Sequence, residues 1–304
     1  MSKIAFIYPG QGAQAVGIGK DFYEKSPLSR TIFDQASEAV NLDLKKLCFE
    51  ENDLLDKTEY TQVAMVTACL AMTRAVESMG LHADMTAGLS LGEYCAIAVA
   101  GGMCDLDAIR TVRSRGIFME HAAPEGSGAM SAVLGMDAAV IEDVLNGREG
   151  VSIANYNCPG QIVITGAADA VGEAGDACKE AGAKRVVPLK VSGPFHSALL
   201  AEAGKKLKEA LEDVTIQPIT IPYLTNVTAD YVKDPADVKD YLVRQVSSSV
   251  RWQQTIERLI ADGAEEFVEI GPGRSLSGFM RKINREVTTC NIDKMEDFNK
   301  YVNR

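Results

Sequence analysis

The feature that most constrains the fold of this chain is a serine placed where an apolar strand pattern changes into a helical pattern. Residues 85–89 read as a short buried strand and residues 91–100 as a helix, with Ser90 on the turn between them. Residues 88–92 are GLSLG, and G-x-S-x-G at such a turn forms a nucleophile elbow, whose serine projects from a strained bend. By itself the pentapeptide fits an ordinary turn better, but the flanking strand and helix reverse that preference. The backbone N–H of Leu91 can then stabilise an oxyanion.

Apolar runs and helical spacings elsewhere predict a parallel sheet covered by helices. Residues 4–8 form a continuous apolar run that stops at a Pro-Gly pair, as in a strand buried on both faces. Further strands are expected at 219–225 and 266–270, and loops at the carboxyl ends of such strands are where α/β sheets bind ligands. Apolar residues at three- and four-residue spacing predict helices over 29–40, 62–79, 105–121 and 196–211.

The middle of the chain, which begins at the glycine-rich residues 123–128, has a different order of predicted strands and helices. Strands are expected at 130–134, 151–156, 161–166 and 184–190, and helices at 137–147 and 168–182. The order βαββαβ is the ferredoxin-like split unit. We therefore expect an α/β-hydrolase-like domain with a parallel sheet, formed by residues 1–126 and 192–304, and an inserted ferredoxin-like small domain over residues 127–191.

A serine nucleophile needs a base, and the chain has only three histidines. His82 and His121 fall near helix ends, where surface or capping positions are the simpler interpretation. His196 follows Ser192-Gly193-Pro194-Phe195 and precedes a predicted helix. Because a helix N-terminus disfavours the imidazolium, this position would keep a general base neutral.

Arg115 is the third residue of interest, and two interpretations of it stay open from the pattern alone. It lies at the edge of an apolar stripe in the helix predicted over 105–121, whereas Arg110 and Arg113 point elsewhere by helical geometry. Its stem could simply cover apolar surface while its head reaches water. Alternatively, its guanidinium could hold a carboxylate.

Composition excludes several other classes of protein. The formal charge of −11 argues against a nucleic-acid partner, and no apolar run reaches membrane-spanning length. The apolar run after Met1 is too short for a signal peptide. Seven irregularly spaced cysteines without a C-x-x-C pair indicate reduced thiols and a cytoplasmic enzyme.

Residues 10–15, GQGAQA, could be taken for a dinucleotide-binding turn, but that motif needs an immediate helix and then an acidic residue at the end of a second strand. Asp34 falls inside a helical pattern instead. No P-loop lysine, zinc-type spacing or calcium loop occurs, so we expect no metal.

Several separated motifs, taken together in order, resemble the bacterial malonyl-CoA:acyl carrier protein transacylases over nearly the whole chain. The matching segments are YPGQGAQ at 8–14, GLSLGEY at 88–94, RG at 115–116, NYN at 155–157 with PGQ at 159–161, GPFHS at 193–197, TNV at 225–227 and EIGPG at 269–273.

That resemblance implies roles for individual residues. Ser90 would be the acylated nucleophile and His196 the acid and base, with the backbone carbonyl of Gln245 orienting the histidine. Arg115 would hold the malonyl carboxylate, and a guanidinium fork matches a carboxylate better than lysine can. The remaining implied site residues are Gln11 and Leu91, whose N–H groups would bind the oxyanion, and Asn155 and Asn157, which would contact substrate.

The resemblance also implies the reaction and its partners. Malonyl-CoA and an acyl carrier protein would be the substrates of a ping-pong transfer in fatty acid biosynthesis, with no cofactor beyond the coenzyme A thioester, and we expect a monomer. Phe195 resembles malonyl-selective members more than methylmalonyl-selective ones. Because carrier proteins are acidic, six basic residues are candidates for docking: Lys184, Arg185, Lys190, Arg274, Arg281 and Lys282.

Two positions depart from the family pattern, and three rival functions remain. Leu89 stands where the family usually has histidine, which removes a polar side chain from the acyl pocket. Ser249 stands where proline is frequent. The rivals are an acyltransferase that serves a polyketide synthase, a serine thioesterase or esterase, and a non-catalytic binding protein.

Overall fold

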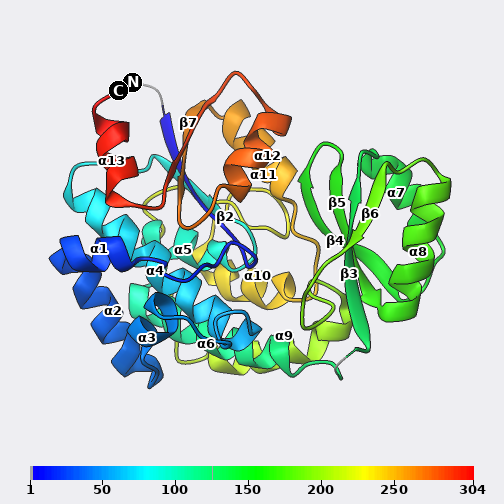
Figure 1. Ribbon diagram of the computed structural model, residues 1–304, viewed down its shortest axis with the longest axis horizontal. Helices are drawn as coiled ribbons and strands as arrows, with labels where there is room; N and C mark the ends of the chain where they lie inside the picture. The colour runs from blue at the N-terminus through cyan, green and yellow to red at the C-terminus, as the bar shows by residue number, and fades with distance from the viewer. Residues whose placement is uncertain (1–2, 125) are drawn as a thin grey trace.

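The computed structural model describes residues 3–124 and 126–304, and the first of its two sheets contains four parallel strands (Figure 1). Their order is β2 (Met85–Gly88), β1 (Lys3–Tyr8), β7 (Ala264–Ile270) and β8 (Thr288–Ile292). Because the strands are parallel, their carboxyl ends meet at one edge of the sheet. The loops after β1, β2 and β7 therefore lie together there, as the pattern predicted.

Helices cover both faces of this sheet. In β1, Phe6 and Tyr8 belong to the core that contains α4, whereas Ala5 and Ile7 belong to the core formed with α11 and α12. The helices of this part of the chain are α1 (Lys20–Lys25), α2 (Pro27–Val40), α3 (Leu44–Phe49), α4 (Thr58–Ser78), α5 (Gly92–Val99), α6 (Asp105–Glu120), α9 (Ala201–Ala210), α10 (Val238–Gln245), α11 (Trp252–Ala261), α12 (Ser275–Ile283) and α13 (Met295–Val302).

The second sheet, green in Figure 1, is antiparallel and stands beside the first. It contains β3 (Gly128–Leu134), β4 (Val151–Cys158), β5 (Gln161–Ala167) and β6 (Arg185–Pro188), with α7 (Ala138–Leu145) and α8 (Ala168–Glu180) as crossovers. The strand order β4-β5-β3-β6 is that of a split βαββαβ unit. The predicted fold class is confirmed, while the domain bounds at 126 and 192 stay a prediction.

One predicted strand is absent, and one predicted helix begins later than expected. Residues 219–225 form no strand: Tyr223 makes a single parallel bridge with Thr86, and the N–H of Thr86 donates to the carbonyl of Pro222. Proline lacks the N–H that a ladder needs on its other side, which limits the pairing to this short stretch.

The helix expected over 196–211 begins later. A 3₁₀ turn, Ala198–Leu200, precedes α9 at Ala201, and His196 lies outside both. A second 3₁₀ turn, Pro235–Asp237, leads into α10.

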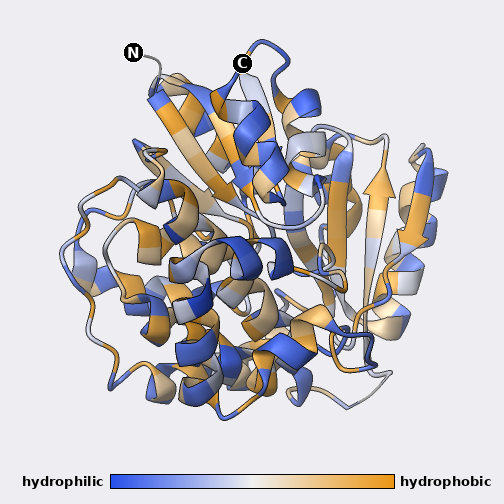
Figure 2. Cartoon of the chain, turned by 60° about the vertical axis from the view of Figure 1, so that its left-hand side comes forward, coloured by the Kyte–Doolittle hydropathy of each residue, from blue (hydrophilic) through white to orange (hydrophobic). Residues whose placement is uncertain are grey.

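Hydrophobic residues gather on the strands of both sheets and on the inward sides of the helices, and polar residues lie on the outward sides (Figure 2). Helix α4 is the exception, because it is buried on all sides along most of its length and packs against α2, α5 and α6. None of the helices in the described part of the chain is both long and apolar enough to cross a membrane.

Candidate active site

Ser90 lies on a sharp turn between β2 and α5 that only small residues at 88 and 92 permit. A Cβ on Gly88 would come within 2.0 Å of the Gly92 backbone, and one on Gly92 within 2.4 Å of the Tyr8 carbonyl oxygen. Ser90 itself has φ 53°, a left-handed conformation rare for non-glycine residues. This is the geometry of a nucleophile elbow, in which the serine side chain stands clear of the strand and the helix.

His196 reaches Ser90 from a segment distant in sequence. Its Nε2 lies 2.8 Å from Ser90 Oγ, and its Nδ1 lies 2.8 Å from the carbonyl oxygen of Gln245. A carbonyl oxygen only accepts, so Nδ1 carries the proton and the lone pair of a neutral ring is on Nε2, facing the serine hydroxyl. The pair has the orientation that proton transfer from Ser90 requires.

Burial keeps this histidine neutral. His196 is almost fully buried, and burial followed by the nearby charge of Arg115 lowers its pKa to about 4. The direction agrees with the sequence analysis, but the reason given there, a helix N-terminus, is wrong, because α9 begins only at Ala201.

Arg115 points from α6 into the same site and is only 1% exposed. Its Nη2 donates to Ser90 Oγ at 3.2 Å and to Gln245 Oε1 at 3.0 Å, and its Nη1 donates to Gln62 Oε1 at 2.6 Å. Burial lowers its pKa from the usual value. Its Nε is buried without a hydrogen-bond partner in the described chain, so one donor of the guanidinium stays unpaired.

The two expected oxyanion donors are free to act. Among the described residues, no hydrogen bond uses the backbone N–H of Gln11 or of Leu91. Leu91 directly precedes α5, so the positive end of that helix dipole also faces the turn. The side chain of Gln11 donates to Thr58 Oγ1 at 3.0 Å, and Thr58 Oγ1 lies 2.8 Å from Ser192 Oγ, which links the Gln11 loop to the segment that carries His196.

Three buried residues that the sequence analysis did not single out complete the site: Gln62, Glu93 and Asn226. Asn226 Oδ1 accepts from the N–H of Ser90 at 2.7 Å, and its Nδ2 donates to the Gly88 carbonyl at 2.7 Å. Glu93 Oε2 accepts from Gln245 Nε2 at 2.6 Å and from the N–H of Asn226 at 3.0 Å. Glu93 and Asn226 stand in the motifs GLSLGEY and TNV, which were the available signal, whereas Gln62 had none.

The remaining predicted residues take no part in the side-chain hydrogen bonds described above. Asn155 and Asn157 are buried in β4, and neither side chain makes a hydrogen bond to Ser90, His196 or Arg115. Leu89 packs against the core that contains Ile7 and Trp252, so it adds apolar contact where the family usually has histidine.

Ser249 Oγ donates to the Ile153 carbonyl at 2.6 Å and ties its loop to β4. A proline there could not make this side-chain bond.

Other candidates are excluded by their positions. His82 and His121 are exposed, and His121 follows the last turn of α6. Arg110 pairs with Asp107 and Arg113 with Glu59. Residues 10–15 lead into no helix before Lys20, so they are not a dinucleotide-binding turn.

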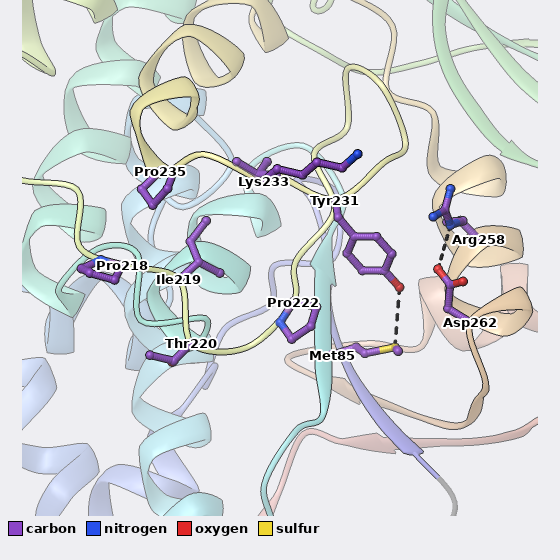
Figure 3. Close-up of a pocket in the computed structure, with 11 residues that line it drawn as sticks. Met85, Pro218, Ile219, Thr220, Pro222, Tyr231, Lys233, Pro235, Arg258 and Asp262 are labelled. Carbon is purple, nitrogen blue, oxygen red and sulfur yellow. Dashed lines mark hydrogen bonds and ion pairs between the residues drawn. The ribbon is translucent and has the colours of Figure 1, made fainter.

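A surface hollow of about 740 Å³ lies beside Met85, at the opposite end of β2 from Ser90 (Figure 3). Its lining includes Tyr231 and the Arg258–Asp262 ion pair, and none of the groups described above. It is separate from the candidate active site.

Comparison with known proteins points in one direction. Residues 5–292 match the family described as acyl transferase domain. The malonyl CoA-acyl carrier protein transacylase of Bacillus subtilis is 46% identical over 301 residues, which cover 97% of this chain and 95% of that relative.

Solved structures agree. The malonyl CoA-acyl carrier protein transacylase from Clostridium perfringens has a TM-score of 0.96 at 38% identity, covering 99% of this chain and 96% of that one. A malonyl-transacylase solved in complex with the acyl-carrier protein of a type II polyketide synthase has a TM-score of 0.94 at 36% identity, covering 99% of both chains. This chain belongs to the acyl transferase domain family and, within it, to the malonyl CoA-acyl carrier protein transacylases.

Proposed function

We propose that this protein transfers a malonyl group from coenzyme A to the phosphopantetheine thiol of an acyl carrier protein through an ester on Ser90. The observation that carries the proposal is the contact of one hydroxyl with two different groups. Ser90 Oγ lies 2.8 Å from a neutral imidazole and 3.2 Å from a buried guanidinium. The first activates a nucleophile, and the second selects an acyl group that ends in a carboxylate.

In the first half-reaction, Ser90 Oγ attacks the thioester carbonyl while its proton passes to His196 Nε2. The N–H groups of Gln11 and Leu91 bind the oxygen that becomes negative. The C–S bond then breaks, the proton moves from His196 to the departing sulfur, and coenzyme A leaves as the thiol. In the second half-reaction the carrier thiol attacks the Ser90 ester, gives its proton to His196, and the Ser90 hydroxyl is restored.

Arg115 is the proposed acyl selector. A malonyl carboxylate can accept two parallel hydrogen bonds from the guanidinium fork, whereas an acetyl group offers the fork no carboxylate acceptor. Hydrolases share the elbow, but plain hydrolysis gives no reason for a buried arginine at the nucleophile, so we favour transfer over the thioesterase or esterase alternative. Methylmalonyl-CoA tests the finer expectation from Phe195, because it should not outcompete malonyl-CoA.

The proposal extends to partners and setting. We propose catalysis without a cofactor beyond the thioester, a monomer, and a cytoplasmic location, which the seven free cysteines support. The pathway follows from the carrier. Fatty acid synthesis is the favoured assignment, and a polyketide carrier is the second candidate because one structural relative binds one.

Intact-protein mass after brief incubation with malonyl-CoA tests the proposal. The native chain should gain one malonyl group, Ser90→Ala should gain none, and addition of acyl carrier protein should remove the group and malonylate the carrier. A native chain that hydrolyses malonyl-CoA without passing the group to the carrier would identify a thioesterase. A chain that gains no mass and hydrolyses nothing would be a non-catalytic protein.

A further inference from the structure

Glu93 is a buried acidic residue that the proposed mechanism does not use. It lies in the first turn of α5, is 0% exposed, and its Oε1 has no hydrogen-bond partner in the described chain. Its Oε2 accepts from the Asn226 backbone and from Gln245 Nε2. A buried carboxyl is costly to retain, so these two contacts are its main compensation.

Gln245 stands between Glu93 and Arg115. Its Nε2 faces Glu93 at 2.6 Å, and its Oε1 faces Arg115 Nη2 at 3.0 Å. No ion pair joins Glu93 to Arg115 directly within the described residues. The amide therefore lies between the Glu93 carboxyl and the Arg115 guanidinium and contacts both.

The orientation of this amide is fixed from both ends. A guanidinium only donates, so the amide atom that faces Arg115 must be the oxygen. Because the amide oxygen faces Arg115, the atom that faces Glu93 Oε2 is the amide nitrogen, which donates to it. If the Glu93 acceptor were lost, Gln245 Nε2 would keep only longer contacts, with the Ser90 carbonyl at 3.0 Å and with Asn226 Oδ1 at 3.4 Å.

We propose that Glu93 is a positioning residue for acyl selectivity, which acts through the Gln245 amide to hold Arg115 in the orientation that receives the acyl carboxylate. The amide oxygen accepts from one N–H of Arg115 Nη2, and the amide keeps the Glu93 carboxyl from pairing with Arg115, so the guanidinium stays directed at Ser90. This proposal rests on the role of Arg115 described above.

The selectivity for malonyl over acetyl distinguishes a positioning role of Glu93 from a merely structural one. If Glu93 only stabilised the elbow, its loss would lower malonyl and acetyl transfer to Ser90 by the same factor. If it positions Arg115, malonyl transfer falls and acetyl transfer, which does not use the guanidinium, falls much less. The ratio of kcat/KM for malonyl-CoA to kcat/KM for acetyl-CoA is therefore the informative quantity.

The experiment compares Glu93→Met, which removes the acceptor, with Glu93→Gln, which retains an oxygen that can receive the Gln245 N–H. Glu93→Met should lower the malonyl-to-acetyl ratio by at least about tenfold, as expected when a hydrogen bond that orients a charged group is lost. Glu93→Gln should keep the native ratio. Glu269→Met is the matched control, because Glu269 is also buried but accepts from the N–H groups of Leu276 and Ser277 at the start of α12. The malonyl-to-acetyl ratio of Glu269→Met should be native.

An unchanged ratio in Glu93→Met overturns the proposal, and so does a ratio in Glu93→Gln that falls as far as in Glu93→Met. Should Glu93→Met fail to fold, Gln245→Met decides, because it removes the same amide and keeps the backbone carbonyl that contacts His196. Its ratio should fall about tenfold, and a native ratio overturns the proposal. Arg115→Ala distinguishes a failure of the Glu93 proposal from a failure of the proposed function. If Arg115→Ala keeps the native malonyl-to-acetyl ratio, the role proposed for Arg115 itself is wrong.

Discussion

At the scale of single residues, the site depends on two non-glycine residues in left-handed backbone conformations. Ser90 has φ 53° and His196 has φ 60°. Such a conformation costs roughly 1–2 kcal/mol for a residue with a Cβ, so the surroundings must hold it in place. For Ser90 they do so at both backbone groups, because Asn226 accepts from its N–H and Gln245 donates to its carbonyl.

Replacing Arg115 by alanine should reduce malonyl transfer much more than acetyl transfer. Loss of a bidentate contact to a carboxylate should cost malonyl kcat/KM at least about a hundredfold. Arg113→Ala is the control on the same helix, since Arg113 pairs with Glu59 instead. Equal losses for the two acyl groups would contradict the clamp.

The lowered pKa of His196 predicts that the ring stays unprotonated, and able to act as a base, in mildly acidic solution. Because Nε2 must be unprotonated and the pKa is about 4, malonyl kcat/KM should not lose activity through this group until the pH approaches 4. A rate profile across pH 4 to 8 checks this, and a fall centred on the ordinary histidine pKa of 6.5 would show that the ring is not desolvated as described.

Stability should respond to Glu93 in the opposite sense from an ordinary carboxylate. Burial raises its pKa from 4.5 to about 7. Between these values the folded chain holds a proton that the unfolded chain has lost, so this residue makes the free energy of unfolding fall as pH rises. Unfolding by denaturant at pH 4.5 and 7 should show Glu93→Gln gaining stability relative to native over that interval, and a constant difference would contradict the shift.

At the scale of elements, periodicity predicted what is regular and missed what depends on contacts across the fold. The strand at 85–88, the buried helix α4 and the whole βαββαβ unit follow from runs and spacings. Residues 219–225 are as apolar as a strand, but Pro222 cannot donate, and only single bridges form.

In the site, too, local motifs predicted some residues, and contacts across the fold determine others. Motifs indicated Ser90, His196 and Arg115. The resemblance also implied that the Gln245 carbonyl contacts His196, but no pattern in the sequence reveals that the Gln245 side chain contacts Arg115. Those contacts depend on how α6 and α10 pack, and this information is not local.

The elbow should tolerate no side chain at position 88. Gly88→Ala would place its Cβ 2.0 Å from the Gly92 backbone, so strand and helix must move apart, at a cost of about 3 kcal/mol in the free energy of unfolding, together with loss of Ser90 acylation. Gly172→Ala in α8 is the control, because its Cβ would meet nothing and a helical alanine should stabilise by up to about 1 kcal/mol. Equal stability of the two variants would contradict this packing.

At the scale of the whole molecule, a local basic surface on this acidic protein is the predicted docking site for the carrier. The structure groups part of the predicted set: Leu134 pairs with both Arg185 and Gln161, and Lys282 donates to Gln161 Oε1 at 3.2 Å. Lys190 lies beyond the other end of β6. The docking surface is therefore best tested at Arg185 and Lys282 first.

Charge reversal at Arg185 and Lys282 should raise the KM for carrier protein by about tenfold at low salt and leave malonyl loading from coenzyme A unchanged. Lys205→Glu is the control, since Lys205 is exposed on α9 and outside the predicted set. Carrier kinetics that match the native chain would exclude this surface.

The contacts that hold Ser90 also set an order of events during synthesis. When residues 1–200 have been synthesised, Ser90 and His196 are present, but Asn226 and Gln245 are not. These two later residues fix the Ser90 backbone, and Gln245 also orients the His196 ring. A nascent or truncated chain therefore contains Ser90 but lacks the two residues that fix its backbone and orient His196. The groups that fix Ser90 and orient His196 are complete only when the C-terminal part of the chain has been made.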